Sequence, residues 1–210
     1  MAGKGDELIQ TTLTYLDEIF IEVVHGRHEE TKSKYLEKGK LCEIHGFKLL
    51  DRVRGVYHHQ YKGQRLKNDF ISGMPDCRVP HGLDVKVCWD LWTYYNANVE
   101  KDNEWQGIGY AWLDNQEQWI FAKCLVDTPD HLIEREKRSL FYEMKVEYED
   151  DPDYQMAVAQ LIKNSKFEDI PEAKRVKEFI VKRDKEKEEL IKKRVVKCRQ
   201  HLNELYNKTK

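Results

Sequence analysis

The segment LDVKVCW, residues 83–89, carries two charges among apolar neighbours. Its Val-rich composition predicts a buried strand, and residues two positions apart in a strand point to the same face. Asp84 and Lys86 therefore project together, while the apolar residues around them point to the opposite face. A buried strand places a carboxylate and an ammonium on one face when they pair or serve a chemical site. Taken alone, the pattern Asp-x-Lys also fits an exposed ion pair.

Asp76 ends the sequence Gly-Met-Pro-Asp at residues 73–76 and precedes Asp84 by eight residues. This gap leaves room for a short turn between two adjacent antiparallel strands, so the two carboxylates are predicted to converge. Converging carboxylates form a hard, anionic site of the kind that Mg²⁺ or Mn²⁺ accepts. Such an ion polarises a phosphodiester and generates hydroxide near neutral pH. With Lys86 available to orient or deprotonate that water, or to stabilise charge on the phosphate, the spacing supports a metal-dependent phosphodiesterase site.

Hydrophobic spacing predicts the elements that hold these residues in place. Helices are expected over residues 5–20, 34–53, 104–113 and 127–145. Strands are expected over residues 53–61, 66–73, 83–89 and 118–126. This order describes a mixed α/β sheet flanked by helices, with Glu43 on the second helix and with Gln106 and Tyr110 on the third.

Composition excludes several classes of protein. The 210 residues suffice for one domain with a sizeable core, and an aromatic content of 11% rules out a disordered chain. No apolar run is long enough to cross a membrane, and residues 1–10 lack the apolar core of a signal peptide, so a cytoplasmic protein is expected. Five scattered cysteines without a CxxC pair fit reduced thiols and neither a disulfide framework nor a zinc site.

Charge is distributed unevenly along the chain. Residues 172–210 hold 14 Lys or Arg against seven Asp or Glu, a net charge of +7, so residues 1–171 carry −9. Apolar residues in this basic segment recur mostly at helical spacing, which predicts a helical extension, residues 172–210, packed on or next to a domain of residues 1–171. The extension either contacts phosphates or presents an ordinary solvated face.

Four features in this order resemble the PD-(D/E)XK nuclease superfamily. Gly-Met-Pro-Asp at 73–76, followed by Asp-Val-Lys at 84–86, is similar to the core pattern in which the second acidic residue and the lysine share a strand. Glu43, inside KGKLCE, resembles the acidic residue on the preceding helix, and QGIGY at 106–110 matches the QxxxY motif of RecB-type and phage lambda-type exonucleases. The stretch 35–129 looks most like the phage exonucleases of the YqaJ viral recombinase group.

The resemblance implies a restriction-endonuclease-like PD-(D/E)XK core and a role for each motif residue. Lys86 would be the catalytic base or electrophile, and Gln106 and Tyr110 would contact the substrate or position the catalytic groups. Mg²⁺ would be the cofactor, with Mn²⁺ as an alternative. The implied metal ligands are Asp76, Asp84, the Val85 carbonyl and Glu43.

The resemblance also implies an activity and partners. Enzymes of this kind degrade one strand of linear double-stranded DNA from an end and leave single strands for a partner annealing recombinase. The resemblance implies a homo-oligomer, which is ring-type in some relatives. It also implies a phage or prophage protein that acts in the cytoplasm of a bacterial host. A restriction-type or structure-specific endonuclease of the same fold and a non-catalytic DNA-binding relative stay open.

Three further groups of residues have open assignments. His81, between the two acidic motifs, is the histidine to check, although the histidines form no HxH or HxxxH cluster. An arginine that binds a terminal phosphate is sought among Arg27, Arg52, Arg54 and Arg65. Aromatic residues that stack on unpaired bases or pack in the core are Trp89, Trp92, Tyr94 and Tyr95.

Overall fold

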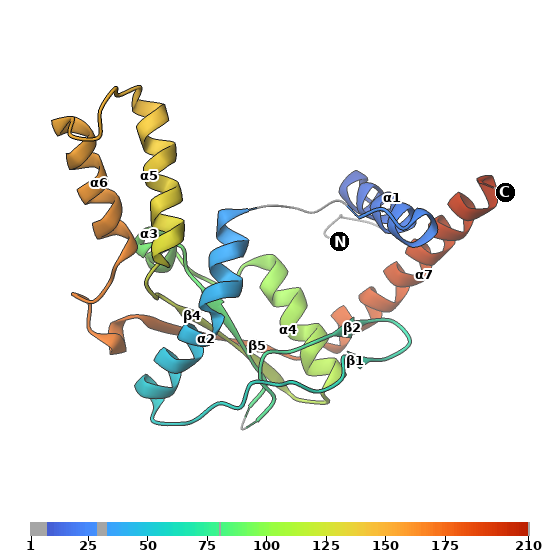
Figure 1. Ribbon diagram of the computed structural model, residues 1–210. Helices are drawn as coiled ribbons and strands as arrows, with labels where there is room; N and C mark the ends of the chain where they lie inside the picture. The colour runs from blue at the N-terminus through green and yellow to red at the C-terminus, as the bar shows by residue number, and fades with distance from the viewer. Residues whose placement is uncertain (1–7, 29–32, 80, 210) are drawn as a thin grey trace.

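A three-stranded mixed sheet lies at the centre of the computed structural model, which describes residues 8–28, 33–79 and 81–209 (Figure 1). Its strands are β3 (Leu83–Val87), β4 (Gln118–Cys124) and β5 (Val176–Lys182), in the order β3-β4-β5. β3 runs parallel to β4, and β5 runs antiparallel to it. β4 is thus the central strand and β3 an edge strand, which confirms the predicted mixed sheet flanked by helices.

Two helices cover the two faces of the sheet. α2 (Lys34–Arg54) packs Phe47 and Leu50 against the face that carries Val85. α4 (Lys101–Leu113) packs Ile108 against Trp119 and Phe121 on the other face. Both helices confirm the predicted ones within a few residues, so the acidic residue on α2 and the QxxxY motif on α4 approach the sheet from opposite faces.

The predicted strand over residues 53–61 is wrong. Gly55 ends α2 in the left-handed region, with φ of 65°. The His58 backbone N–H then donates to the Asp51 carboxylate, so the chain folds back against α2 rather than running beside another strand. The next expected strand, residues 66–73, divides into a small antiparallel hairpin of β1 (Leu66–Lys67) and β2 (Ser72–Gly73).

The C-terminal segment is only partly helical, which corrects the predicted helical extension. Residues 176–182 form β5, whose Phe179 and Val181 pair in register with Phe121 and Trp119, and they give β4 its second neighbour. α7 (Lys185–Lys208) follows as a long helix. It packs against α1 (Gln10–His25) and α4, and Figure 1 shows α1 and α7 side by side. Residues 5–7 of the predicted first helix lie outside the described residues.

The remaining helices lie at the opposite end of the molecule from α7. α5 (Asp130–Met144) and α6 (Pro152–Ser165) form a hairpin that projects from the sheet (Figure 1). α5 confirms its prediction, whereas α6 was not expected from its acidic surroundings; Asp151 caps it and Pro152 begins it. Two short elements complete the chain, α3 (Leu91–Tyr95) and the 3₁₀-helix η1 (Glu172–Lys174). Within the described residues, every helix is too short or too polar to cross a membrane.

Candidate active site

Asp76 and Asp84 meet at the edge of the sheet, as their spacing predicted. The backbone N–H of Asp76 lies 3.3 Å from Asp84 Oδ1, and the Val85 N–H donates to Asp76 Oδ2 at 2.8 Å. Cys77 and Leu83 exchange two backbone hydrogen bonds of 3.0 Å, which close the connection between the two acidic residues like a hairpin. The two carboxylates are therefore held together by the backbone on both sides.

Lys86 lies on the same face of β3 as Asp84, and its Nζ donates to Asp84 Oδ2 at 2.9 Å. The Asp84 side chain is almost fully buried, with 1% exposed, whereas the Lys86 side chain keeps 31% exposed. Burial lowers the pKa of Lys86, but the charges of Asp84 and Asp76 outweigh burial and leave that pKa above its usual value. The side chain is therefore a cation at neutral pH, suited to stabilising negative charge on a phosphate.

Negative charge is crowded at this site. Burial, followed by the charge of Asp84, raises the pKa of Asp76 to about 7. Burial and the same charge of Asp84 also raise the pKa of Glu43 on α2, against a smaller opposing effect of Lys86. Since a divalent cation would offset this repulsion, the electrostatics fit the predicted metal site.

The oxygen ligands available at this site suit Mg²⁺, which binds few protein groups, better than they suit a metal coordinated by protein side chains alone. Among the described residues, no three His, Cys, Asp or Glu side chains lie close enough together to hold a metal ion. Mg²⁺ is commonly bound by one or two carboxylates together with waters and substrate phosphate. Val85 N–H points to Asp76, and the N–H and C=O of one strand residue point to the same side, so the Val85 carbonyl faces this site. Glu43 lies near enough to be affected by Asp84 electrostatically.

α4 approaches the site through the two residues of the QxxxY motif. Gln106 Nε2 donates to the Tyr110 hydroxyl at 3.3 Å, and that hydroxyl donates to the Met74 carbonyl at 2.9 Å. The Tyr110 ring needs the space that Gly73 leaves open, because a Cβ there would lie 2.4 Å from Tyr110 Cε1. Tyr110 therefore holds the loop that precedes Asp76, which favours a positioning role over direct contact with substrate.

A lysine beside Lys86 was missed from the sequence. Lys123 of β4 pairs in register with Lys86, faces the same side of the sheet and binds Glu100 at 3.0 Å. Its signal was available, because QWIFAKCLV places a charge in a buried strand just as LDVKVCW does. Further polar partners of the acidic loop, Arg78, Asp114 and Gln116, carried no such signal because they lie outside the helices and strands.

The arginine candidates for a terminal phosphate separate by their partners. Arg52 binds Glu172 and Arg54 binds Glu178, so both are already paired with carboxylates. Arg65 instead lines a cavity of about 330 Å³, which also includes Met74 and the QxxxY residues. Arg27 is exposed just beyond the end of α1. Arg65 is the candidate of the four that lies beside the site.

The predicted stacking aromatics divide into buried and exposed residues. Tyr94 is buried, and Trp89 packs edge-on against Tyr35. Trp92 and Tyr95 on α3 are 79% and 72% exposed and remain available to a ligand. His81 is exposed on the connection between the acidic residues.

Comparison with solved structures finds likenesses of fold over nearly the whole chain. The chain superimposes on a phage-related exonuclease from Haemophilus somnus 129PT with a TM-score of 0.74 and 25% identity, over 98% of this chain and 86% of that one. An alkaline exonuclease, LHK-Exo from Laribacter hongkongensis, has the same fold, with a TM-score of 0.63 and 11% identity over 97% of this chain and 87% of that one. LHK-Exo in complex with dAMP gives a TM-score of 0.60 and 12% identity over 93% and 84%.

The sequence matches no protein-family model and no curated protein. The structural likenesses nevertheless span nearly the whole chain, and they confirm the resemblance and the fold predicted from the four motifs.

Proposed function

We propose that this chain, whose fold is that of phage-related and alkaline exonucleases and whose motifs resemble the PD-(D/E)XK superfamily, is a metal-dependent exonuclease acting on linear double-stranded DNA. The observation that carries the proposal is the convergence of Asp76 and Asp84 beside the Lys86 ammonium. A likeness of fold alone would not specify chemistry, whereas this arrangement suits phosphodiester hydrolysis. The fold of LHK-Exo, which binds the deoxynucleotide dAMP, is consistent with DNA as the partner.

Each residue of the site has its own proposed role in hydrolysis. Asp76, Asp84 and the Val85 carbonyl would hold Mg²⁺ or Mn²⁺, with Glu43 supporting the site through its charge. An ion of this kind supplies a water of lowered pKa and a polarised phosphodiester. Lys86 stabilises charge that develops on the phosphate, because its own pKa keeps it protonated. Gln106 and Tyr110 fix the loop that carries Asp76.

The test compares digestion of linear, nicked circular and closed circular duplex DNA by the purified protein, with Mg²⁺ or with EDTA. We expect digestion of linear DNA alone, only with the metal, and at least a 10²-fold slower rate for Lys86→Ala. Lys48→Ala, which removes an exposed lysine of α2, is the control and keeps the wild-type rate.

Each alternative has its own outcome in this assay. Cutting of the closed circle identifies an endonuclease of the same fold. A wild-type protein that binds DNA and digests none of the three substrates, just like Lys86→Ala, is a non-catalytic relative. A linear substrate blocked at one end then gives the direction of digestion.

The proposed assembly and partner rest on the resemblance. We place the enzyme in the cytoplasm of a bacterial host, as a homo-oligomer that supplies single strands to an annealing recombinase. Light scattering of the purified chain measures the assembly directly, and a monomer on DNA would contradict it.

A further inference from the structure

The two acidic residues of the site need a mechanical support, because their charges repel each other. Asp76 precedes the connection to Leu83, and Asp84 follows it. Two backbone hydrogen bonds between Cys77 and Leu83 close the base of this connection. Beyond that base, the connection would be free to twist unless something fixed it to the rest of the fold.

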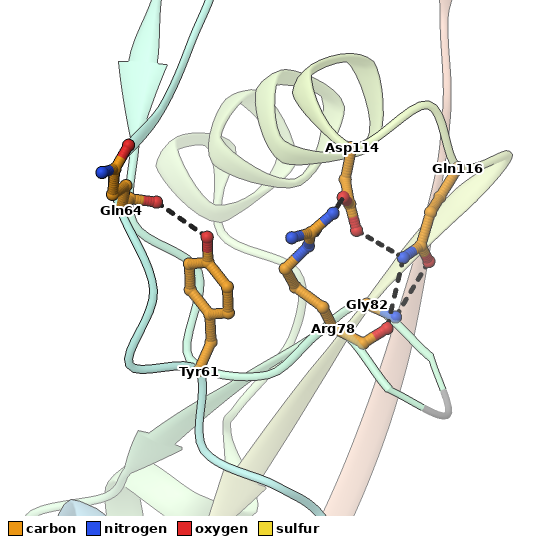
Figure 2. Close-up of polar contacts among 6 residues, drawn as sticks. All are labelled: Tyr61, Gln64, Arg78, Gly82, Asp114 and Gln116. Atoms are coloured by element: carbon orange, nitrogen blue, oxygen red, sulfur yellow. Dashed lines mark hydrogen bonds and ion pairs between the residues drawn. The ribbon is translucent and has the colours of Figure 1, made fainter.

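Side chains of the turn between α4 and β4 form hydrogen bonds and an ion pair with the connection (Figure 2). Arg78 Nε donates to Asp114 Oδ1 at 2.7 Å, and Arg78 Nη2 donates to the same oxygen. Gln116 Nε2 lies 2.6 Å from Asp114 Oδ2 and 3.4 Å from the Arg78 carbonyl. Gln116 Oε1 accepts a hydrogen bond of 2.9 Å from the Gly82 N–H. One amide side chain therefore contacts both arms of the connection.

A third contact ties the same network to Asp76 itself. The Tyr61 backbone N–H donates to the Asp76 carbonyl at 2.7 Å, and the Arg78 guanidinium lies 5.1 Å from the centre of the Tyr61 ring. Arg78 is thus held between a ring and a carboxylate, and the Asp114 side chain is only 3% exposed. The Arg78 side chain is 37% exposed, so the buried partner of this pair is Asp114, whose carboxylate would be left uncompensated without the guanidinium.

We infer that Arg78, Asp114 and Gln116 are positioning residues that hold the Asp76 carboxylate against Asp84 in the arrangement a divalent cation needs. The inference rests on the proposed metal-dependent function. Both flanks of Asp76 are fastened to one helix and its turn: Tyr110 of α4 holds Met74 before Asp76, and the turn after α4 holds Arg78 behind it. α4 and the turn that follows it therefore contact the chain on both sides of Asp76.

The test measures Mn²⁺ binding by calorimetry and the unfolding midpoint Tm in EDTA, for wild type and three variants. Gln116→Ala removes the contact with both arms and leaves the Arg78–Asp114 pair. Arg78→Lys keeps the charge and loses the fork of donors. The double variant Arg78→Ala with Asp114→Asn removes both charges, so that no buried charge is left alone.

We expect Gln116→Ala and the double variant to bind Mn²⁺ about 10-fold more weakly or worse, with Arg78→Lys between them and wild type. Cleavage by Gln116→Ala should fall at limiting Mg²⁺ and recover toward the wild-type rate at saturating Mg²⁺. The control is Arg135→Ala, which breaks an exposed ion pair with Glu37 between α5 and α2 and should keep wild-type affinity.

Two outcomes overturn different statements. A wild-type protein that binds no Mn²⁺ overturns the proposed metal-dependent function. A wild-type protein that binds Mn²⁺, with all three variants within twofold of it, overturns the inference alone, whatever their Tm values. Variants that lose Tm in EDTA while the folded protein keeps its affinity show a network that only stabilises the fold.

Discussion

The Asp76 carboxyl group couples the site to the stability of the metal-free protein. Its pKa in the folded chain is about 7, because of burial and the neighbouring Asp84, whereas an unfolded chain leaves it near 3.8. A folded-state pKa above the unfolded one means that ionisation disfavours folding. The stability contribution is therefore complete below about pH 4 and is lost as pH rises toward 7.

Replacing Asp76 with Asn should accordingly stabilise the metal-free protein at high pH. We expect Asp76→Asn to be at least about 1 kcal/mol more stable than wild type at pH 8, with little difference at pH 4. Urea unfolding in EDTA at both pH values measures this. Asp169→Asn, an exposed carboxylate beyond α6, should leave the pH dependence as it is. A large loss of stability for Asp76→Asn at pH 8 would instead identify a structural ion-pair network.

The sequence predicts the part of the site that lies on a single strand, because side chains two positions apart point to the same face. The spacing of Asp84 and Lys86 predicts that they share one face, and the structure pairs them. The short connection from Asp76 to Asp84 permits few geometries, so it predicts that the two carboxylates converge, as the structure shows. Arg78 and Gln116 could not be predicted, because turns have no periodicity and their partners lie more than 30 residues away in the chain.

The contact between α2 and β3 depends on a glycine. A Cβ at Gly46 would lie 2.6 Å from Val85 Cγ1, closer than side chains tolerate. Because Val85 stands between the two charged residues of β3, a displacement of its side chain would move the strand that carries the site. Space at this one position therefore lets α2 lie directly on the edge strand.

Gly46→Ala should cost about 1–3 kcal/mol of unfolding free energy and weaken Mn²⁺ binding, since the helix or the edge strand must shift. The matched control is Gly39→Ala on the same helix, where an added Cβ meets nothing within 4 Å. That substitution should be neutral or stabilise by about 0.5–1 kcal/mol, because alanine favours a helix interior. Urea unfolding of the two variants measures both changes. Equal changes in unfolding free energy would show that the close contact between Gly46 and Val85 does not limit the packing of α2.

The elements that periodicity misplaced are those whose partners are distant. VKEFIVK reads as part of a helix beside the long basic helix, yet it becomes β5 because β4 needs a second neighbour. Residues 53–61 include strand-forming residues, but their β pairing is limited to an isolated bridge between Gln60 and Cys77. The segment turns back along α2 through His58 and Asp51. In both cases the strand partners that the fold offers or withholds outweigh local preference.

The basic C-terminal helix extends away from the sheet, and its exposed lysines bear on DNA binding. Because residues 176–182 are a strand of the sheet, removing everything after residue 170 would disrupt the fold and would not test the helix. Substitution of exposed side chains on α7, Lys185 and Lys193, leaves the sheet intact.

The double variant Lys185→Gln with Lys193→Gln should bind duplex DNA more weakly. Each lost phosphate contact lowers the slope of log affinity against log salt by about 1, so a change of up to about 2 is expected. Fluorescence anisotropy across a range of salt concentrations measures the slope. Lys48→Gln on α2 is the control, and an unchanged slope in the double variant would remove α7 from the DNA surface.

The pairing of the chain's first and last helices has a consequence for the order of folding during synthesis. β4 acquires its second neighbour only when residues 176–182 have left the ribosome, and α1 then finds its partner in α7. Until that moment the growing chain holds its acidic pair beside an incomplete sheet. A nascent chain of this kind completes the sheet that carries the site only after residue 182 has been made, so folding of the site waits for residues far beyond β3 in the sequence.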